Sequence, residues 1–449
     1  MLGCAGHLPT LKKPDVPGAW QQAAPSGAPI WPTKTWWAGF GSDELNALIA
    51  TAEGNNFDLA AATARVRQAS AVARQAGSVL LPSLAIEGSA THQYGRSSGA
   101  SAHESDFSAG LAASYELDFW GKNLDTWKSA RALRKASIAD RQTVALTTTA
   151  SVADTYFALL SIRERLDIAR ANLESSRDMV KLIERRVHAG MAAPADLTLQ
   201  MAAASAEESL IPQLEQQELE TRTALATLLG RPPEGFDVKA QDLSGLSSPE
   251  VAPGMPSELL TRRPDIVAAE ANLEAAHADL AAARAAFLPS IGLTGAGGLQ
   301  SPSLNGAVTT LAGTGLGYTV SASLLQTLFD GGRKIAVEAE ARAHQQELVA
   351  KYRSAVIAAY GDVENALGRL AHTAQQQALE ERHAALSEKS LTSQQRRYAA
   401  GATDFLSVAE AERGLHAARD QLAQARLAHL QAVVSLYRAL GGGWSAGNT

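Results

Sequence analysis

The sequence predicts an α+β membrane protein in which several copies of the chain share one β-barrel and one tunnel of long α-helices. Three observations lead to this fold class. The 449 residues contain an internal duplication, each half holds two segments of strand-like alternation, and each half then holds a very long helical stretch. Self-similarity at this length indicates two copies of a half-protein rather than a solenoid of short repeats.

The duplication appears as matching residues at two constant spacings. Matches 207 residues apart join Asp58-Leu59 with Asp265-Ile266 and Leu81-Pro82-Ser83 with Leu288-Pro289-Ser290. Matches 211 residues apart join Gly121 with Gly332, Gly190 with Gly401, and Leu229-Gly230 with Leu440-Gly441. We therefore predict a first repeat at 43–250 and a second at 251–443, between an N-terminal arm (1–42) and a C-terminal tail (444–449).

Two segments in each half alternate between apolar and polar residues, as half-buried strands do. They are about 83–94 and 107–119 in the first half, and about 290–300 and 318–329 in the second. A Ser/Gly-rich loop at 95–105 is expected between the first two. Each segment is long enough for the roughly 9–11 tilted residues with which a strand crosses a bilayer. Four strands cannot close a membrane barrel, which needs about eight, so at least two chains must share it.

Each strand pair is followed by a proline-free helical stretch, at about 122–188 and 333–400. At about 1.5 Å per residue such a helix is on the order of 100 Å long, and it needs neighbouring helices to bury its apolar stripe. Glycines mark the tip turns that follow, at about 189–196 and 400–404, before a shorter helix returns. Pro212 lies inside the first returning helix, where we expect a kink or a local break.

Composition and motifs argue against several other classes. The net charge of −6 argues against a nucleic-acid partner. No apolar run reaches the roughly 18 residues of a membrane-spanning helix. The sequence contains no HExxH, no Gly-x-Ser-x-Gly and no phosphate-binding loop, and His92 and His103 lack the spacing of metal ligands. We predict no enzyme, no metal site and no cofactor.

Four motifs carry a family resemblance: LLTRRPDI at 259–266, FLPS at 287–290, LFDGGR at 328–333 and ELDFWG at 116–121. Together they resemble the TolC-like outer-membrane efflux family, in its lipoprotein branch of OprM/NodT-type outer-membrane factors. The resemblance implies a homotrimer in which four strands per chain make a twelve-stranded barrel above a periplasmic helical tunnel. It also implies a periplasmic adaptor, an inner-membrane pump of the resistance-nodulation-division (RND) type, and passive conduction of drugs or other small toxic solutes.

The N-terminal arm contains a residue at which we predict a lipid anchor. Met1-Leu2-Gly3-Cys4 is similar to the end of a bacterial lipoprotein signal, whose cysteine is acylated. The basic and apolar segments that normally precede such a cysteine are missing, which a late start codon or a trimmed signal would explain. We expect lipidation at Cys4, with a free cysteine as the alternative. The rest of the arm is interpreted as an extended segment docked by its tryptophans: Trp20, Trp31, Trp36 and Trp37.

The resemblance also implies roles for residues near the tip turns, which we assign by their position in the chain. Leu406 and Glu410 correspond to a periplasmic gate constriction, where three copies would form an apolar ring and an acidic ring. Asp196 and Tyr398 correspond to a latch that links neighbouring tip helices when the gate is closed. The alternatives are a solvated helix residue for Glu410 and a simple N-terminal helix residue for Asp196.

Two further groups are assigned by their place along the chain. Small residues at the tip turns would leave shallow grooves for the adaptor: Gly190, Met191, Gly401 and Ala402. Aromatic residues stand where strands become helices, and we interpret them as a girdle at the membrane's periplasmic edge, with core packing as the alternative: Phe119, Trp120 and Phe329.

Two other functions remain open from the sequence. A duct for type I protein secretion would have the same architecture. A periplasmic coiled-coil scaffold that never enters a membrane would explain the long helices, but it would not explain two pairs of alternating strands. The transported solute is not specified by any motif.

Overall fold

The computed structural model describes residues 18–22, 30–97, 100–252, 254–301 and 316–444. These residues divide into two compact units. Unit 1 contains 64–139 and 268–354, and the rest of the described chain belongs to unit 2. Each predicted repeat contributes residues to both units.

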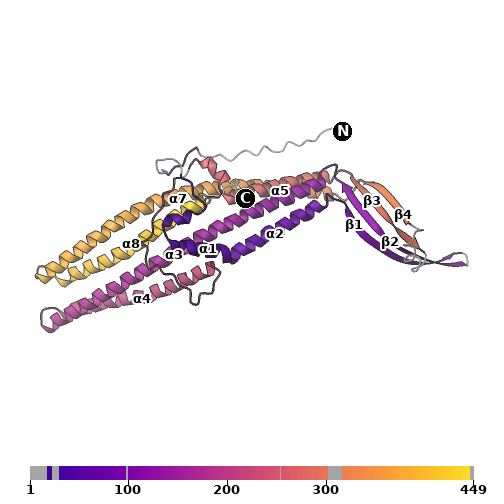
Figure 1. The fold of residues 1–449 in the computed structure, drawn as a ribbon. Helices are drawn as coiled ribbons and strands as arrows, with labels where there is room; N and C mark the ends of the chain where they lie inside the picture. Colours follow the sequence, from indigo (N-terminus) through magenta and orange to yellow (C-terminus); the bar gives the residue numbers. More distant parts are fainter. Residues whose placement is uncertain (1–17, 23–29, 98–99, 253, 302–315, 445–449) are drawn as a thin grey trace. The chain divides into compact units, whose positions relative to one another are not determined.

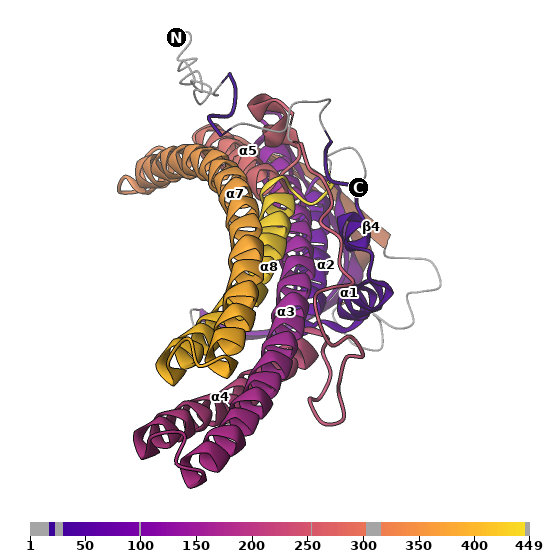
Figure 2. The same cartoon turned by 90° about the vertical axis from the view of Figure 1, so that its left-hand side faces the viewer.

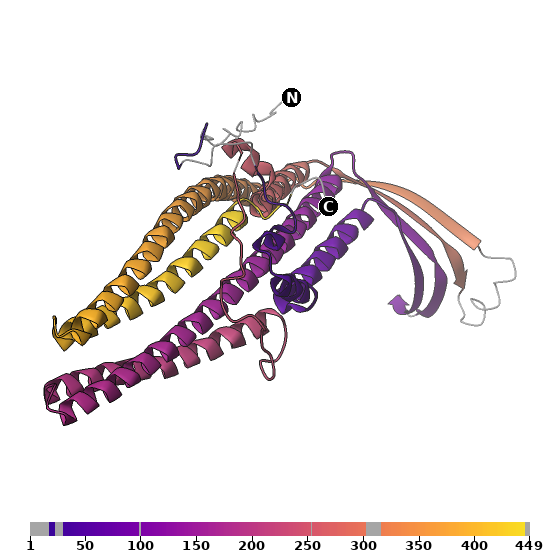
Figure 3. The same ribbon diagram turned by 60° about the vertical axis from the view of Figure 1, so that its left-hand side comes forward.

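Unit 1 is built on a sheet in which the described residues form four antiparallel strands, ordered β1–β2–β3–β4 (Figures 1 and 3). The strands are β1 (Ser83–Ser97), β2 (Ala100–Leu117), β3 (Ser290–Ser301) and β4 (Leu316–Leu325). Their register places Ile86 opposite Leu111, Leu111 opposite Gly297, and Gly297 opposite Tyr318. Because successive residues of a strand point to opposite faces, this register gathers the alternating apolar positions of all four strands on one face.

That apolar face is open to its surroundings. Ile86 is 86% exposed and Val320 is 77% exposed, although both are large aliphatic side chains. The opposite face carries short hydroxyl contacts between β1 and β2, at 2.7 Å between Ser83 and Ser114. The sheet therefore presents one apolar face and one polar face, as expected for a strand set between lipid and water.

The strand ends differ from the predicted ones. The loop predicted at 95–105 is wrong, because β1 continues to Ser97 and β2 already begins at Ala100. Backbone pairing continues there although the alternation has ended, since the ladder needs no apolar face. At the other end, β2 stops at Leu117 and β4 at Leu325, before the predicted ends at 119 and 329.

Four of the helices form two hairpin-like pairs. Their bounds are α1 (Asp43–Asn55), α2 (Phe57–Ser78), α3 (Lys122–His188), α4 (Pro194–Leu228), α5 (Pro264–Ala285), α7 (Arg333–Ala399) and α8 (Phe405–Ala439), with short 3-10 helices η1 (Trp36–Phe40) and η2 (Pro256–Thr261). Within unit 2, α4 returns beside α3 and α8 returns beside α7 (Figures 1 and 2). We call these pairs the α3–α4 hairpin and the α7–α8 hairpin.

Of the kink or local break expected at Pro212, the break does not occur, because α4 runs through this residue without interruption. Pro212 removes one backbone donor from the helix. Packing on both sides of it offsets that loss: Leu214 is buried against Leu166 and Ala169 of α3, and Ile211 packs against the same cluster. Tertiary contact here outweighs the local cost of proline.

Two matching joints in unit 2 bring the turn that follows one helix against the point where a second helix ends and a third begins. In the first, the turn glycine after α4 meets the end of α1, and a Cβ at Gly230 would lie 2.3 Å from the Asn55 carbonyl oxygen. In the second, after α8, a Cβ at Gly441 would lie 1.9 Å from the Arg262 carbonyl oxygen. Both glycines have positive φ, 67° and 86°. Only glycine allows this approach and this backbone conformation together.

Each joint is closed by a side chain that reaches the last carbonyl groups of the arriving helix. Asn56 Nδ2 donates to the Leu228 carbonyl at 2.9 Å. Arg263 donates to the Ala439 carbonyl at 3.2 Å. Asn56 and Arg263 are 207 residues apart, and Leu228 and Ala439 are 211 apart, so these contacts follow both spacings of the duplication. The two copies conserve the joint and differ in the residue that closes it.

The irregular segment between α4 and η2 is fastened to the helices by a buried arginine. Arg163 of α3 is 6% exposed and donates to the carbonyl groups of Val238 and Ala240 at 2.8 and 3.0 Å. It also forms ion pairs with Asp237 and Glu218. Burial opposes ionisation of Asp237, but its hydrogen bond to Arg163 prevails and lowers the pKa of that carboxyl.

Tryptophans in the described part of the N-terminal arm contact other segments of unit 2. Trp36 stacks on Tyr437 of α8, with ring centroids 4.9 Å apart. Trp20 donates its indole N–H to the Gly254 carbonyl at 2.8 Å. The Arg262 guanidinium lies 4.2 Å from the ring of Trp31. The arm is thus held largely by aromatic side chains.

A partly buried carboxyl lies in the helical wall of unit 2. Burial raises the pKa of Asp154 to about 7, although the positive charge of Arg438 lowers it. One oxygen, Oδ1, is buried and has no hydrogen-bond partner in the described part of the chain. Keeping a charge at this position therefore costs free energy above neutral pH.

The glycine joint gives a first prediction. Gly441→Ala should destabilise the assembled protein by about 3 kcal/mol or more, because the methyl group meets the backbone of Arg262 in addition to the strain of a positive φ. Gly235→Ala is the matched control, since Gly235 has φ 72° but nothing within 4 Å of its Cβ position. It should lose only about 1 kcal/mol. Denaturant unfolding in detergent checks both; equal losses would contradict the steric role of the joint.

Asp154 gives a second prediction. Between about pH 4 and 7 the Asp154 carboxyl is protonated in the folded state and ionised in the unfolded state. The free energy of unfolding therefore contains a stabilising contribution from Asp154 at low pH. This contribution falls by at most about 1.4 kcal/mol per pH unit as the pH rises. Asp154→Asn removes that dependence, so the variant should gain on the wild type as the pH rises through this range. Unfolding measured across the range tests this. Asp167→Asn, at a side chain that is 68% exposed, is the control; a gap that does not widen with pH contradicts the prediction.

Candidate functional site: hairpin tips and sheet edges

The tips of the two hairpins share one backbone geometry. Gly190 and Gly401 adopt φ 71° and 70°. In each turn the residue after the glycine donates its N–H to the carbonyl oxygen five residues before it. Met191 donates to Arg186 and Ala402 donates to Arg397, both at 2.8 Å. This bond closes a Schellman-type helix end. A Cβ at either glycine would meet nothing within 4 Å, and Met191 is 65% exposed, so both tips are open surfaces.

The helices that leave the tips begin with acidic residues. The Asp196 carboxylate accepts the Ala193 N–H at 3.2 Å. Asp404 is the N-cap of α8, and its carboxylate accepts the N–H of Ser407 at 3.0 Å and its hydroxyl at 2.7 Å. These hydrogen bonds lower the pKa of Asp404 below its ordinary value. Asp404 was not predicted from the sequence, although Asp directly before a helix is a preferred N-cap residue.

The two residues of the predicted latch have different neighbours within the chain. Tyr398 lies under the Arg186 guanidinium, 4.3 Å from its ring centroid, and its ring is 5.9 Å from that of Phe405. Asp196 is engaged in starting α4, as described above. In the described chain the two side chains do not hydrogen-bond to each other. A contact between them would have to join neighbouring copies.

The two residues of the predicted constriction lie one turn apart on α8. Leu406 is 46% exposed and Glu410 is also exposed. The neighbouring positions Phe405, Val408 and Ala409 are buried instead. Leu406 and Glu410 therefore belong to a helix face that this chain leaves uncovered.

The buried face of α8 packs the two hairpins together near their tips. Ile183 of α3 forms a core cluster with three buried residues of α8: Phe405, Val408 and Ala409. Partly buried residues pack against this cluster from α4 (Leu197) and from α7 (Leu391 and Tyr398). This apolar cluster fixes the position of the exposed Leu406 and Glu410, because they lie on the opposite side of the same helix turns.

Above this cluster the hairpins meet through buried polar groups, which we call the polar layer. Glu412 of α8 is 3% exposed and accepts the Ser175 hydroxyl of α3 at 3.1 Å. It also accepts from Gln200 of α4 at 3.4 Å. One turn further, His416 contacts Glu207 of α4 at 3.0 Å. Polar groups in a helix interface fix its register, since a shift would leave them unpaired.

The polar layer was not predicted from the sequence. Its residues lie more than 200 positions apart, so no local pattern joins them. Glu412, His416 and Asp420 are spaced by four residues, and Asp420 pairs with Arg165 at 2.6 Å. A row of charged residues interrupting an apolar helix face was the available signal.

The second candidate site is the pair of sheet edges. In the described residues β1 pairs only with β2, and β4 pairs only with β3. The predicted girdle residues are exposed near these strands: Phe119 by 67%, Trp120 by 47% and Phe329 by 89%. Core packing, the alternative for all three aromatic residues, does not fit this exposure. Trp120 donates its indole N–H to the Pro289 carbonyl at 2.7 Å.

Three remaining expectations concern the N-terminus, metals and helices. Cys4 lies outside the described residues. Among the residues that are described, no group of three or more His, Cys, Asp or Glu side chains could hold a metal ion. No helix formed by those residues is long and apolar enough to cross a membrane.

A sheet with one open apolar face, two unpaired edges and paired helical hairpins defines a subunit of an oligomeric outer-membrane channel. Comparison with known proteins gives the same class. The family model "Outer membrane efflux protein" matches twice, at residues 48–231 and 255–442. The chain belongs to this family of outer-membrane efflux proteins.

Individual relatives cover nearly the whole chain. The pyoverdine export outer membrane protein OpmQ of Pseudomonas putida is 39% identical over 99% of this chain and 96% of its own length. The probable outer membrane lipoprotein SilC of Salmonella typhimurium is 30% identical over 99% of this chain and 96% of its own. Among solved structures, the outer-membrane channel OprN superposes with a TM-score of 0.89 at 29% identity, covering 95% of this chain and 97% of its own.

These findings confirm the predicted TolC-like fold, the outer-membrane location and the efflux function. The protein is a channel component rather than a scaffold that stays outside the membrane. Outer-membrane channels of tripartite efflux systems are trimers that work with partner proteins.

Proposed function

We propose that three copies of this chain form a passive duct that receives solutes from a periplasmic adaptor, with an inner-membrane RND pump supplying the energy. The observation that carries this proposal is the sheet with two unpaired edges in a chain whose helical hairpins end in exposed turns. The edges call for further copies of the chain, and the turns offer a surface to a partner. A duct of this kind moves solutes without chemistry of its own.

The cargo we propose is a small secreted solute of the kind that OpmQ is named for. OpmQ is named for pyoverdine export and is 39% identical to this chain over nearly its full length. Selection among solutes then belongs mainly to the pump, because the duct accepts what the adaptor and pump deliver.

Lipid contacts are proposed at two places. Cys4 carries the lipid anchor, and the name of SilC as a probable lipoprotein supports this. Phe119, Trp120 and Phe329 form the aromatic girdle, which their exposure favours because interfacial aromatics need an apolar body in contact with lipid.

The adaptor is proposed to dock on the tip turns. Gly190, Met191, Gly401 and Ala402 are exposed, and the two glycines have open space around them. A helical hairpin of the partner could approach the backbone closely at both turns. Because the turns share one geometry, each chain offers two similar docking positions.

The gate is proposed to form where three α8 helices converge. Leu406 would then supply an apolar ring and Glu410 an acidic ring that attracts cations. The latch would be a hydrogen bond from Tyr398 of one copy to Asp196 of its neighbour, charge-assisted and therefore strong. It would have to compete with the Arg186 and Ala193 contacts that these residues have within one chain.

Single-channel recording in planar bilayers tests the gate, the latch and the adaptor together. Purified wild-type trimers should have a low conductance, and this conductance should rise after the purified adaptor is added.

Tyr398→Phe combined with Asp196→Asn should raise conductance several-fold without the adaptor, since asparagine keeps the helix start but weakens the latch. Glu410→Gln should lower cation selectivity, because three carboxylates leave the ring.

The control is Glu184→Gln, at an exposed glutamate near the end of α3. It should change neither conductance nor selectivity. Unchanged conductance in the double variant would contradict the latch, and a selectivity loss equal to that of Glu184→Gln would contradict the acidic ring. A channel that the adaptor leaves unaltered would contradict docking at the tips.

A further inference from the structure

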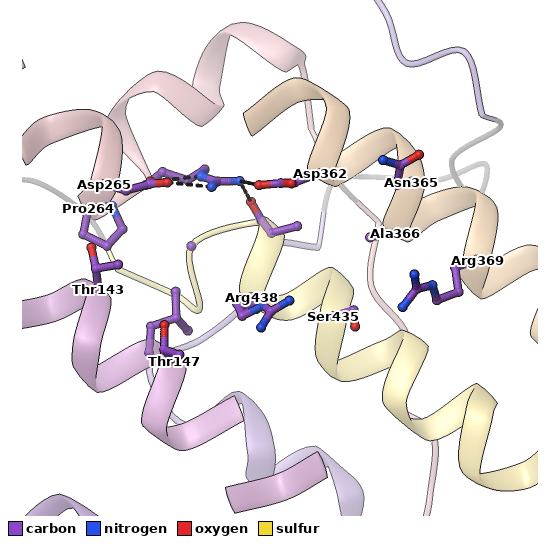
Figure 4. Close-up of a pocket in the computed structure, with 14 residues that line it drawn as sticks. Thr143, Thr147, Pro264, Asp265, Asp362, Asn365, Ala366, Arg369, Ser435 and Arg438 are labelled. Carbon is purple, nitrogen blue, oxygen red and sulfur yellow. Dashed lines mark hydrogen bonds and ion pairs between the residues drawn. The ribbon is translucent and has the colours of Figure 1, made fainter. Parts of the chain in front are cut away.

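A polar pocket of about 370 Å³ lies in unit 2, away from the hairpin tips. It is bordered by α3, α7, the end of α8 and the start of α5, and it is open to solvent on one side, where Arg369 and Arg438 are exposed (Figure 4). The lining side chains that can contact a ligand by charge or hydrogen bond include Thr147, Asn365, Arg369, Ser435 and Arg438. Neither the duct nor the gate described above uses this pocket.

One arginine of the pocket is already satisfied. Arg263 forms ion pairs with Asp265 at 2.6 Å and with Asp362 at 3.0 Å. Its remaining donors include the bond to Ala439 that closes the second joint. The two carboxylates of the pocket are therefore both engaged by Arg263 at one side of it.

The other two arginines have no such partner. In the described part of the chain, neither Arg369 of α7 nor Arg438 of α8 forms an ion pair. Figure 4 shows their side chains extending toward one another, with Ser435 between them. Asp154 is the anionic group that acts on Arg438, but burial holds its pKa at about 7, so it offsets that charge only in part at neutral pH.

Two guanidinium groups without an ion-pair partner among the described residues, on separate helices, favour a ligand that carries two negatively charged groups. Each guanidinium presents a planar set of donors that matches a carboxylate. The hydroxyl of Ser435 and the amide of Asn365 add neutral donors nearby. Because the two guanidinium groups stand on separate helices, two anionic groups of one ligand could each contact one of them, and the volume of about 370 Å³ exceeds what a single inorganic ion fills.

We propose that this pocket binds a small organic di- or tricarboxylate, held by Arg369 and Arg438. The bound anion would neutralise two like charges that α7 and α8 bring together. It would also join α7 to α8 beside the joint at Gly441, which lines the same pocket. Binding would stabilise the folded state in proportion to the ligand concentration above its dissociation constant.

Calorimetric titration of the purified full-length protein with citrate tests the proposal. Acetate and inorganic phosphate, at matched ionic strength, are the comparison anions. We expect saturable binding of citrate and much weaker binding of the other two. Arg369→Gln and Arg438→Gln should each weaken citrate binding about tenfold or more, because each removes a charge-assisted bidentate contact.

Arg382→Gln is the matched control, since Arg382 is exposed on the same helix α7 and lies outside the pocket. It should bind citrate like the wild type. Asn365→Asp is a second pocket variant at an exposed position, and its added negative charge should abolish binding even if an arginine variant fails to fold. Absence of saturable citrate binding, or equal binding by the Asn365→Asp variant and the wild type, would overturn the proposal.

Discussion

The unpaired backbone groups along β1 and β4 are the constraint on which the rest of this protein depends. In hydrocarbon each N–H or C=O group without a partner costs several kcal/mol, so an open sheet cannot remain there alone. One chain forms four strands in its described residues, and its apolar face is exposed. Joining three copies edge to edge satisfies the backbone and turns that face toward lipid. The number of copies in the barrel then also sets the number of helical hairpins in the tunnel.

The helical part is organised by duplicated contacts that the two repeats have elaborated differently. Both joints place a positive-φ glycine against a backbone carbonyl. Asn56 closes the first joint with a neutral amide, whereas Arg263 closes the second with a charge that requires Asp265 and Asp362. The hairpin tips also combine a shared feature with a difference. Both tip turns have the same backbone geometry, but the exposed pair Leu406 and Glu410 stands only after the second turn. The features that both repeats share build the fold, and the residues in which the repeats differ are the candidates for functional sites.

Much of this architecture could be predicted from the sequence, because its signals are local and periodic. Alternation revealed the strands wherever one face was apolar, and it failed at 95–105, where polar residues continue the backbone ladder. The rule that proline breaks helices failed at Pro212, because packing of Leu214 against α3 outweighs one lost hydrogen bond. The polar layer around Glu412 and the charges around Arg438 could not be predicted, since they unite residues from distant helices. The four-residue spacing of Glu412, His416 and Asp420 indicates a polar stripe on α8, but it does not identify the partners on the other helices.

Cysteine crosslinking between the two edge strands tests the central claim most directly. Ser89→Cys in β1 would be combined in turn with Thr319→Cys, Ser321→Cys and Ser323→Cys in β4, in outer membranes of living cells. A disulfide needs Cα atoms about 4.4–6.8 Å apart, so one pairing should be strongly favoured. We predict that this pair gives covalent dimers and trimers, while each single-cysteine variant, with Cys4 still present, gives none. Failure of every pairing to link separate chains would contradict a barrel shared through β1 and β4.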